Sequence, residues 1–130
     1  MRLIAPTLHR VLDFITVAAF AVAPTLLHLT GVAALLAYAL AVVHLTLTLL
    51  TRFPAGPARA VPFAWHRGIE LVVGVALVLL ALLAPWGGDA RAFYLVAGLV
   101  IFAVWALSSS GAEAPSAHAP SRRADEGRRV

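Results

Sequence analysis

The most restrictive feature of the sequence is a run of 38 residues, from Phe14 to Thr51, that contains no Asp, Glu, Lys or Arg. A bilayer core has no water to satisfy backbone N–H and C=O groups, so only helices or closed barrels cross it. About 20 apolar residues suffice for one helical span. Two more charge-free stretches, 71–88 and 92–112, are rich in Leu, Val and Ala and do not alternate in polarity as barrel strands would. The sequence therefore predicts four membrane-spanning helices.

Composition supports the same fold class. Apolar residues make up 62% of the 130 residues and charged residues 12%, which is more apolar side chain than a single soluble core can bury. The chain has no cysteine, which excludes disulfide scaffolds and thiolate metal sites. We expect an all-α, integral membrane four-helix bundle over residues 1–108 and a disordered cytoplasmic tail over 109–130. The expected helices cover about 8–28, 31–51, 66–86 and 91–108.

The basic residues predict the orientation of the chain. All ten are arginines, and nine of them precede the first span, join the second span to the third or follow the fourth. Only Arg91 lies in an opposite turn. The positive-inside rule then places both termini and the 52–67 loop in the cytoplasm of a multi-pass protein of the bacterial inner (plasma) membrane. Scattered loop arginines do not make the basic face that nucleic acid requires, so the expected partner is the lipid bilayer.

A cleavable signal peptide is the main alternative for the first segment. Arg2 and Arg10 flank an apolar run that ends in Ala21-Val22-Ala23, which resembles a cleavage site. Asp13 would interrupt the apolar region, however, and Pro24 would follow the scissile bond and hinder cleavage. We therefore expect the first helix to be retained.

The sequence also repeats itself. His9-Arg10-Val11-Leu12-Asp13 and His66-Arg67-Gly68-Ile69-Glu70 share the pattern His, Arg, any residue, aliphatic, carboxylate, and they are 57 residues apart. Each signature opens an apolar span that leads to a proline. Residues 6–51 and 62–108 are thus predicted to be two helical hairpins that enter from the same side, a parallel repeat about an axis along the membrane normal.

The proline stations within these repeats resemble the SPW-repeat family of small bacterial integral membrane proteins. Ala84-Pro85-Trp86 matches the family's Ser-Pro-Trp motif in two positions, and Ala23-Pro24-Thr25 matches it in one. The resemblance covers about residues 6–108. It implies a four-helix membrane protein with two helices in each repeat, and it implies no established activity.

The same prolines have a mechanical interpretation that does not depend on the family. Proline lacks a backbone donor and clashes with the preceding turn, so Pro24 should kink or end the first helix and Pro85 the third. Trp86 could then anchor at the level of the lipid headgroups.

Chemistry can reside only in the ionisable residues of the spans. A charged side chain at the bilayer centre costs about 2.5 to 3.5 kcal/mol, so Asp13 and Glu70 should face protein or water. Each follows a histidine by four residues, which places His9 with Asp13 and His66 with Glu70 on one helix face. If the repeats pack symmetrically, these four residues and His44 converge in the cytoplasmic half of the bundle.

Such a cluster has three interpretations. It is a set of local polar contacts, a transition-metal site made of imidazoles and carboxylates, or a path for protons or a solute. A haem held by two imidazoles is a further and weaker alternative. Without a metal ion we expect no cofactor.

Small residues at every fourth position, Ala33, Ala37 and Ala41, permit close helix packing. This face either builds the bundle or carries a homo-oligomer contact. The sequence contains no phosphate-binding loop, zinc-protease or hydrolase motif, so we do not expect an enzyme. The expected function is a structural or interaction role in the membrane. The alternative is a membrane carrier of protons, metal ions or electrons that uses His9, Asp13, His44, His66 and Glu70.

Overall fold

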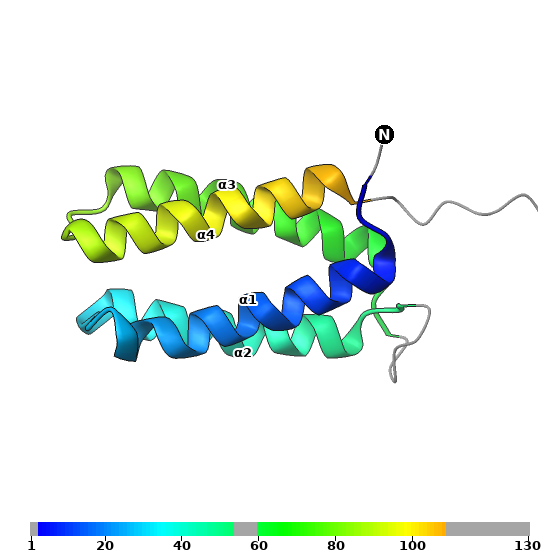
Figure 1. Cartoon of the computed structure of the whole chain (residues 1–130), viewed down its shortest axis with the longest axis horizontal. Coiled ribbons are helices and arrows are strands. Elements are labelled where there is room, and N and C mark those ends of the chain that lie inside the picture. Colours follow the sequence, from blue (N-terminus) through cyan, green and yellow to red (C-terminus); the bar gives the residue numbers. More distant parts are fainter. Residues whose placement is uncertain (1–2, 54–59, 109–130) are drawn as a thin grey trace, which may run out of the picture.

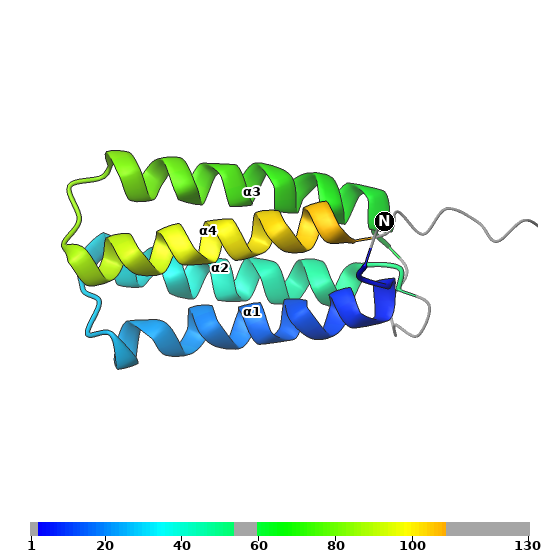
Figure 2. The same ribbon diagram turned by 45° about the horizontal axis from the view of Figure 1, so that its top comes forward.

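The computed structural model describes residues 3–53 and 60–108, which fold into four helices that lie side by side (Figures 1 and 2). They are α1 (Pro6–Leu26), α2 (Gly31–Leu50), α3 (Phe63–Leu83) and α4 (Gly88–Leu107). The described residues contain no β-strand, only two isolated bridges. The predicted all-α class with four helices is confirmed, while the predicted tail over 109–130 lies outside the described residues.

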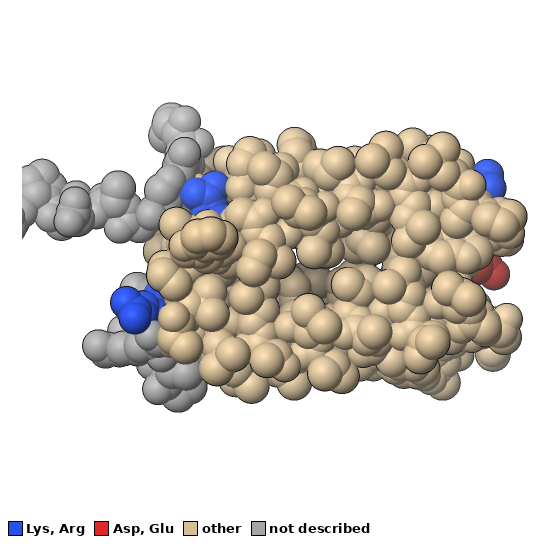
Figure 3. Space-filling view, turned by 180° about the vertical axis from the view of Figure 1, so that it is seen from behind, with Lys and Arg blue, Asp and Glu red and all other residues tan. Residues whose placement is uncertain are grey.

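All four helices are long and apolar enough to cross a membrane. At about 1.5 Å per residue, helices of this length extend about 30 Å, the thickness of a hydrocarbon core. Large apolar side chains point outward, and Leu35, Val72 and Leu83 are 70%, 67% and 80% exposed. On the face drawn in Figure 3, charged residues of the described chain lie only at the two ends of the bundle. An apolar belt between charged ends is the surface that a multi-pass membrane protein needs.

The helices follow the repeat distance of the sequence signature. Both α3 and α4 begin and end 57 residues after α1 and α2. The observed helices begin up to three residues earlier than predicted, because Pro6 occupies the first position of α1 and Pro62 is the N-cap residue of α3. A fixed φ and a missing N–H suit proline to the first turn, so the helices start before the His-Arg pairs.

The prolines at the other end differ in their effect. Pro24 lies inside α1, which continues to Leu26, whereas α3 ends two residues before Pro85. The prediction that proline stops the helix is therefore correct for Pro85, while Pro24 falls within the last turn of its helix. The half-buried Trp86 lies against Tyr94, with ring centroids 4.7 Å apart, so its indole packs on its own hairpin.

Each hairpin is packed through small residues. α1 packs on α2 and α3 on α4. A Cβ atom at Gly98 would lie 2.8 Å from the carbonyl oxygen of Gly74, so the close approach of α3 and α4 requires glycine at this position. In the first hairpin, Ala33, Ala37 and Ala41 are buried within one chain. The face predicted for a homo-oligomer contact is thus covered by the chain itself.

The two hairpins meet mainly at their ends. At one end the Tyr94 hydroxyl donates to the Ala33 carbonyl oxygen at 2.6 Å, and Phe20 and Phe93 pack edge to face. Between the ends, an apolar groove of about 160 Å³ separates α1 from α4 and is lined in part by Phe20, Phe93 and Val96. The other meeting point is a buried polar cluster, at the end where α1 and α3 begin.

Candidate metal centre

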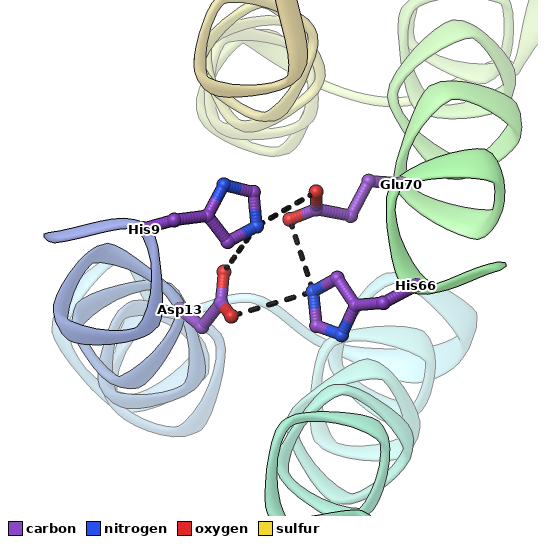
Figure 4. Close-up of side chains that lie close together, drawn as sticks. All are labelled: His9, Asp13, His66 and Glu70. Carbon is purple, nitrogen blue, oxygen red and sulfur yellow. Dashed lines mark ion pairs between the residues drawn. The ribbon is translucent and has the colours of Figure 1, made fainter. Parts of the chain in front are cut away.

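The cluster is built from the first two turns of α1 and α3. His9 and His66 are each the fourth residue of their helix, and Asp13 and Glu70 follow one turn later on the same face. Figure 4 shows all four side chains pointing into the space between the two helices. Their exposed fractions are between 0 and 2%. Hereafter these four residues are called the quartet.

The quartet is a closed ring of alternating imidazoles and carboxylates (Figure 4). Across the hairpins, His9 Nε2 lies 3.0 Å from Glu70 Oε2, and His66 Nε2 lies 3.3 Å from Asp13 Oδ2. Within each helix, the His9–Asp13 separation is 3.4 Å and the His66–Glu70 separation is 3.5 Å. One ligand atom from each of the four residues lies within 4.8 Å of all the others.

Two hydroxyl groups orient the imidazoles from outside the quartet. Ser108 Oγ lies 2.6 Å from His9 Nδ1, and Thr51 Oγ1 lies 2.8 Å from His66 Nδ1. Each hydroxyl also donates to a backbone carbonyl one turn earlier, Ser108 to Val104 at 2.6 Å and Thr51 to Leu47 at 2.6 Å. Sequence reasoning missed both hydroxyls, although Thr51 and Ser108 are 57 residues apart, the same distance that separates the histidine pairs.

The hydroxyls fix the tautomer of each histidine. Because each hydroxyl proton is used on a carbonyl, the oxygen accepts the N–H of Nδ1, and in a neutral imidazole the lone pair is then on Nε2. Both Nε2 atoms point at carboxylates, which are acceptors as well. None of His9 Nε2, His66 Nε2, Asp13 Oδ2 and Glu70 Oε2 makes a hydrogen bond of acceptable geometry. Four acceptors therefore surround one point, which is an arrangement that a cation satisfies.

The backbone holds these hydroxyls in place by the same device in both halves. Thr51 forms an isolated bridge with Val61, just before α3, and Ser108 forms one with Ile4, just before α1. The amide of Val61 donates to Leu50 O at 2.9 Å, so the segment before each helix is tied to the end of another helix. The outer partner of each histidine is thereby positioned by the main chain.

Aromatic rings cover the quartet at this end of the bundle. The Phe63 ring packs edge to face on His9 at 5.1 Å, and the Phe53 ring lies 5.7 Å from the His66 ring. Phe53 is itself buried and lies 5.4 Å from Phe63. These rings exclude water, which strengthens electrostatic interactions inside the quartet.

The fifth predicted residue, His44, lies beside the quartet on α2. Its Nε2 is 3.7 Å from Asp13 Oδ1, and it is not among the ligand atoms that lie within 4.8 Å of one another. The structure thus brings His9, Asp13, His66 and Glu70 together and places His44 at their edge. The motif residues Pro24, Pro85 and Trp86 lie at the opposite end of their helices and contribute nothing to the cluster.

Comparisons with known proteins add no relative. No family model matches this chain, and neither a curated protein nor a solved structure is similar to it at a significant level. The site must therefore be interpreted from its own chemistry.

Proposed function

We propose that this protein is a multi-pass membrane protein that binds one divalent transition-metal ion at the quartet. Convergence of four acceptor atoms in a buried space is the observation that carries the proposal. With bonds of about 2.0 to 2.2 Å, neighbouring ligands of one ion are about 2.8 to 3.6 Å apart for angles of about 90° to 110°. The four quartet separations, from 3.0 to 3.5 Å, fall within this range.

The charges of the site support the same function. Two carboxylates with neutral imidazoles carry two negative charges, and one divalent cation compensates them without a counterion from solvent. Metal-bound histidines generally donate their second ring N–H to an outer partner, and Ser108 and Thr51 are such partners. Imidazole and carboxylate ligands together suit first-row metals such as zinc, iron and manganese.

The test is the metal content of the protein purified in detergent and loaded with Zn²⁺ or Fe²⁺. Wild-type protein should retain about one equivalent after gel filtration, and Glu70→Gln should retain much less because the amide loses the negative charge. Asp89→Asn is the matched control, since Asp89 is exposed at the opposite end of the bundle. Equal metal retention in wild type and Glu70→Gln would refute the proposal.

A purely structural quartet is the second candidate function. The His9–Glu70 and His66–Asp13 contacts both join α1 to α3, and they connect hairpins that otherwise meet mainly at the far end. With both histidines protonated, the four groups would form a neutral ion-pair network that needs no metal. This interpretation corresponds to a structural role in the membrane, and it predicts loss of stability in Glu70→Gln without any metal retention in wild type.

Membrane insertion and orientation belong to the same proposal. The apolar belt and the distribution of arginines support a bacterial inner-membrane protein with both termini in the cytoplasm. Two parallel hairpins of the SPW-repeat type are supported by the 57-residue offset and by Ala84-Pro85-Trp86. Reporter fusions should place residues 1 and 130 on the cytoplasmic side and the turn at 87 on the other. Termini on opposite sides would refute this topology.

A further inference from the structure

One histidine beside the quartet has no counterpart in the other half of the chain. His44 lies on α2, and the position 57 residues later, on α4, is the buried Ile101. His44 is 7% exposed, and its Nε2 has no hydrogen-bond partner. A buried polar nitrogen without a partner is costly, so this atom is expected to have a ligand or partner in the working protein.

The α2 side of the site is polar and the α4 side is apolar. Thr48 lies one turn from His44, and its buried Oγ1 also has no hydrogen-bond partner. The corresponding residues of α4 are Ile101 and Trp105. The quartet itself is symmetric between the two halves, so His44 is the chemical feature that makes one side of the site different from the other.

Resting on the metal-binding function proposed above, we propose that His44 is a fifth ligand of the bound ion. Its Nε2 is 3.7 Å from Asp13 Oδ1, which is the separation of two ligands with bonds of about 2.1 Å and an angle of about 120°. Such an angle occurs between equatorial ligands of a five-coordinate ion. The ring of His44 lies 6.1 Å from that of His66 and turns toward the quartet when the ion binds.

Five ligands narrow the class of metal. Structural zinc sites are almost always closed with four ligands in a tetrahedron. Three imidazole nitrogens and two carboxylate oxygens form a mixed set that suits iron(II) or manganese(II), which take more ligands readily. The ion expected at this site is therefore a divalent iron-type metal rather than a structural zinc.

The repeat itself supplies the experiment. Full-length protein in detergent is loaded with Co²⁺, whose visible absorption is intense for four-coordinate tetrahedral ions and weaker for five-coordinate ions. Wild type should give the weak five-coordinate spectrum. His44→Ile, which copies the residue on α4, should bind one Co²⁺ with the intense tetrahedral spectrum. The double variant His44→Ile/Ile101→His moves the imidazole to the equivalent place beside Glu70 and should restore the weak spectrum.

Two controls separate a lost ligand from lost packing. His28→Ala removes a histidine at the opposite end of the bundle and should leave the spectrum unchanged. His44→Gln keeps a polar side chain of similar size and should behave like His44→Ile, which keeps the test valid if the isoleucine variant does not fold. A spectral change in His44→Ile that the double variant fails to reverse would indicate a packing effect and would overturn the inference.

Failure of the fifth ligand is distinguishable from failure of the metal site. If both His44 variants bind Co²⁺ with the wild-type spectrum and affinity, His44 is not a ligand and the quartet alone holds the ion. If Asp13→Asn and Glu70→Gln also bind Co²⁺ as wild type does, the proposed metal-binding function is wrong as well.

Discussion

Removal of the Thr51 hydroxyl provides a sharp test of how the site is organised. Thr51→Val keeps the shape of the side chain but removes the oxygen that lies 2.8 Å from His66 Nδ1. Two effects follow. The Nδ1–H group is left buried without an acceptor, and the tautomer that directs the Nε2 lone pair into the quartet is no longer favoured by a hydrogen bond.

The size of both effects can be worked out from the contacts. Loss of an outer partner of a metal ligand typically lowers metal affinity about 10- to 100-fold, which corresponds to about 1.4 to 2.7 kcal/mol. Without metal, an unsatisfied buried donor should lower the free energy of unfolding by about 1 to 3 kcal/mol. Ser108→Ala should have a similar effect on affinity through His9, because its oxygen lies 2.6 Å from Nδ1.

Competition between the protein and a chromophoric chelator measures the affinity. Thr46→Val is the matched control, because Thr46 Oγ1 donates to Val42 O on the same helix at 2.8 Å but is exposed and touches no histidine in the described contacts. Thr46→Val should retain wild-type affinity. Equal affinities of Thr51→Val and Thr46→Val would refute the reasoning that the hydroxyl selects the tautomer.

Three further predictions concern the packing of the bundle, and thermal unfolding in detergent measures each of them. Gly98→Ala should destabilise the protein by about 1 to 3 kcal/mol, because its Cβ would lie 2.8 Å from the Gly74 carbonyl oxygen, and an unchanged melting temperature would contradict this close approach. Gly68→Ala should instead stabilise α3 by up to about 1 kcal/mol, since nothing lies within 4 Å of that Cβ. Tyr94→Phe should cost about 0.5 to 1.5 kcal/mol through loss of the hydrogen bond to Ala33 O, and an unchanged stability would show that this contact does not join the hairpins.

The four helices were predictable because charge-free length is a strong signal in a chain this apolar. Helix boundaries were less predictable, since the polar His-Arg pairs suggested later starts than Pro6 and Phe63. The i, i+4 spacing correctly placed each histidine above its carboxylate on one helix face. That the two pairs meet depends on the packing of α1 against α3, which sequence periodicity alone does not determine.

The outer partners of the histidines were not predicted, for a physical reason. Thr51 and Ser108 lie just beyond the ends of apolar helices, where hydroxyl residues are common and usually face water or the backbone. Their role becomes visible only when the bridges to Val61 and Ile4 bring them beside the histidines. The 57-residue offset was the available signal, and applied beyond the His-Arg signature it pairs these two residues as well.

Site and fold are coupled in this bundle because the same four residues serve both. The hairpins meet through a polar cluster at one end and through the Tyr94–Ala33 hydrogen bond and the Phe20–Phe93 contact at the other. Removing one partner of the quartet leaves a buried charge uncompensated, which typically costs 3 to 5 kcal/mol. A bound ion therefore stabilises the association of the two halves, by about 2.7 kcal/mol when the free metal concentration is about 100 times the Kd. Metal occupancy and the angle between the hairpins should consequently change together, so a site that exchanges its ion would also move the two halves of the protein.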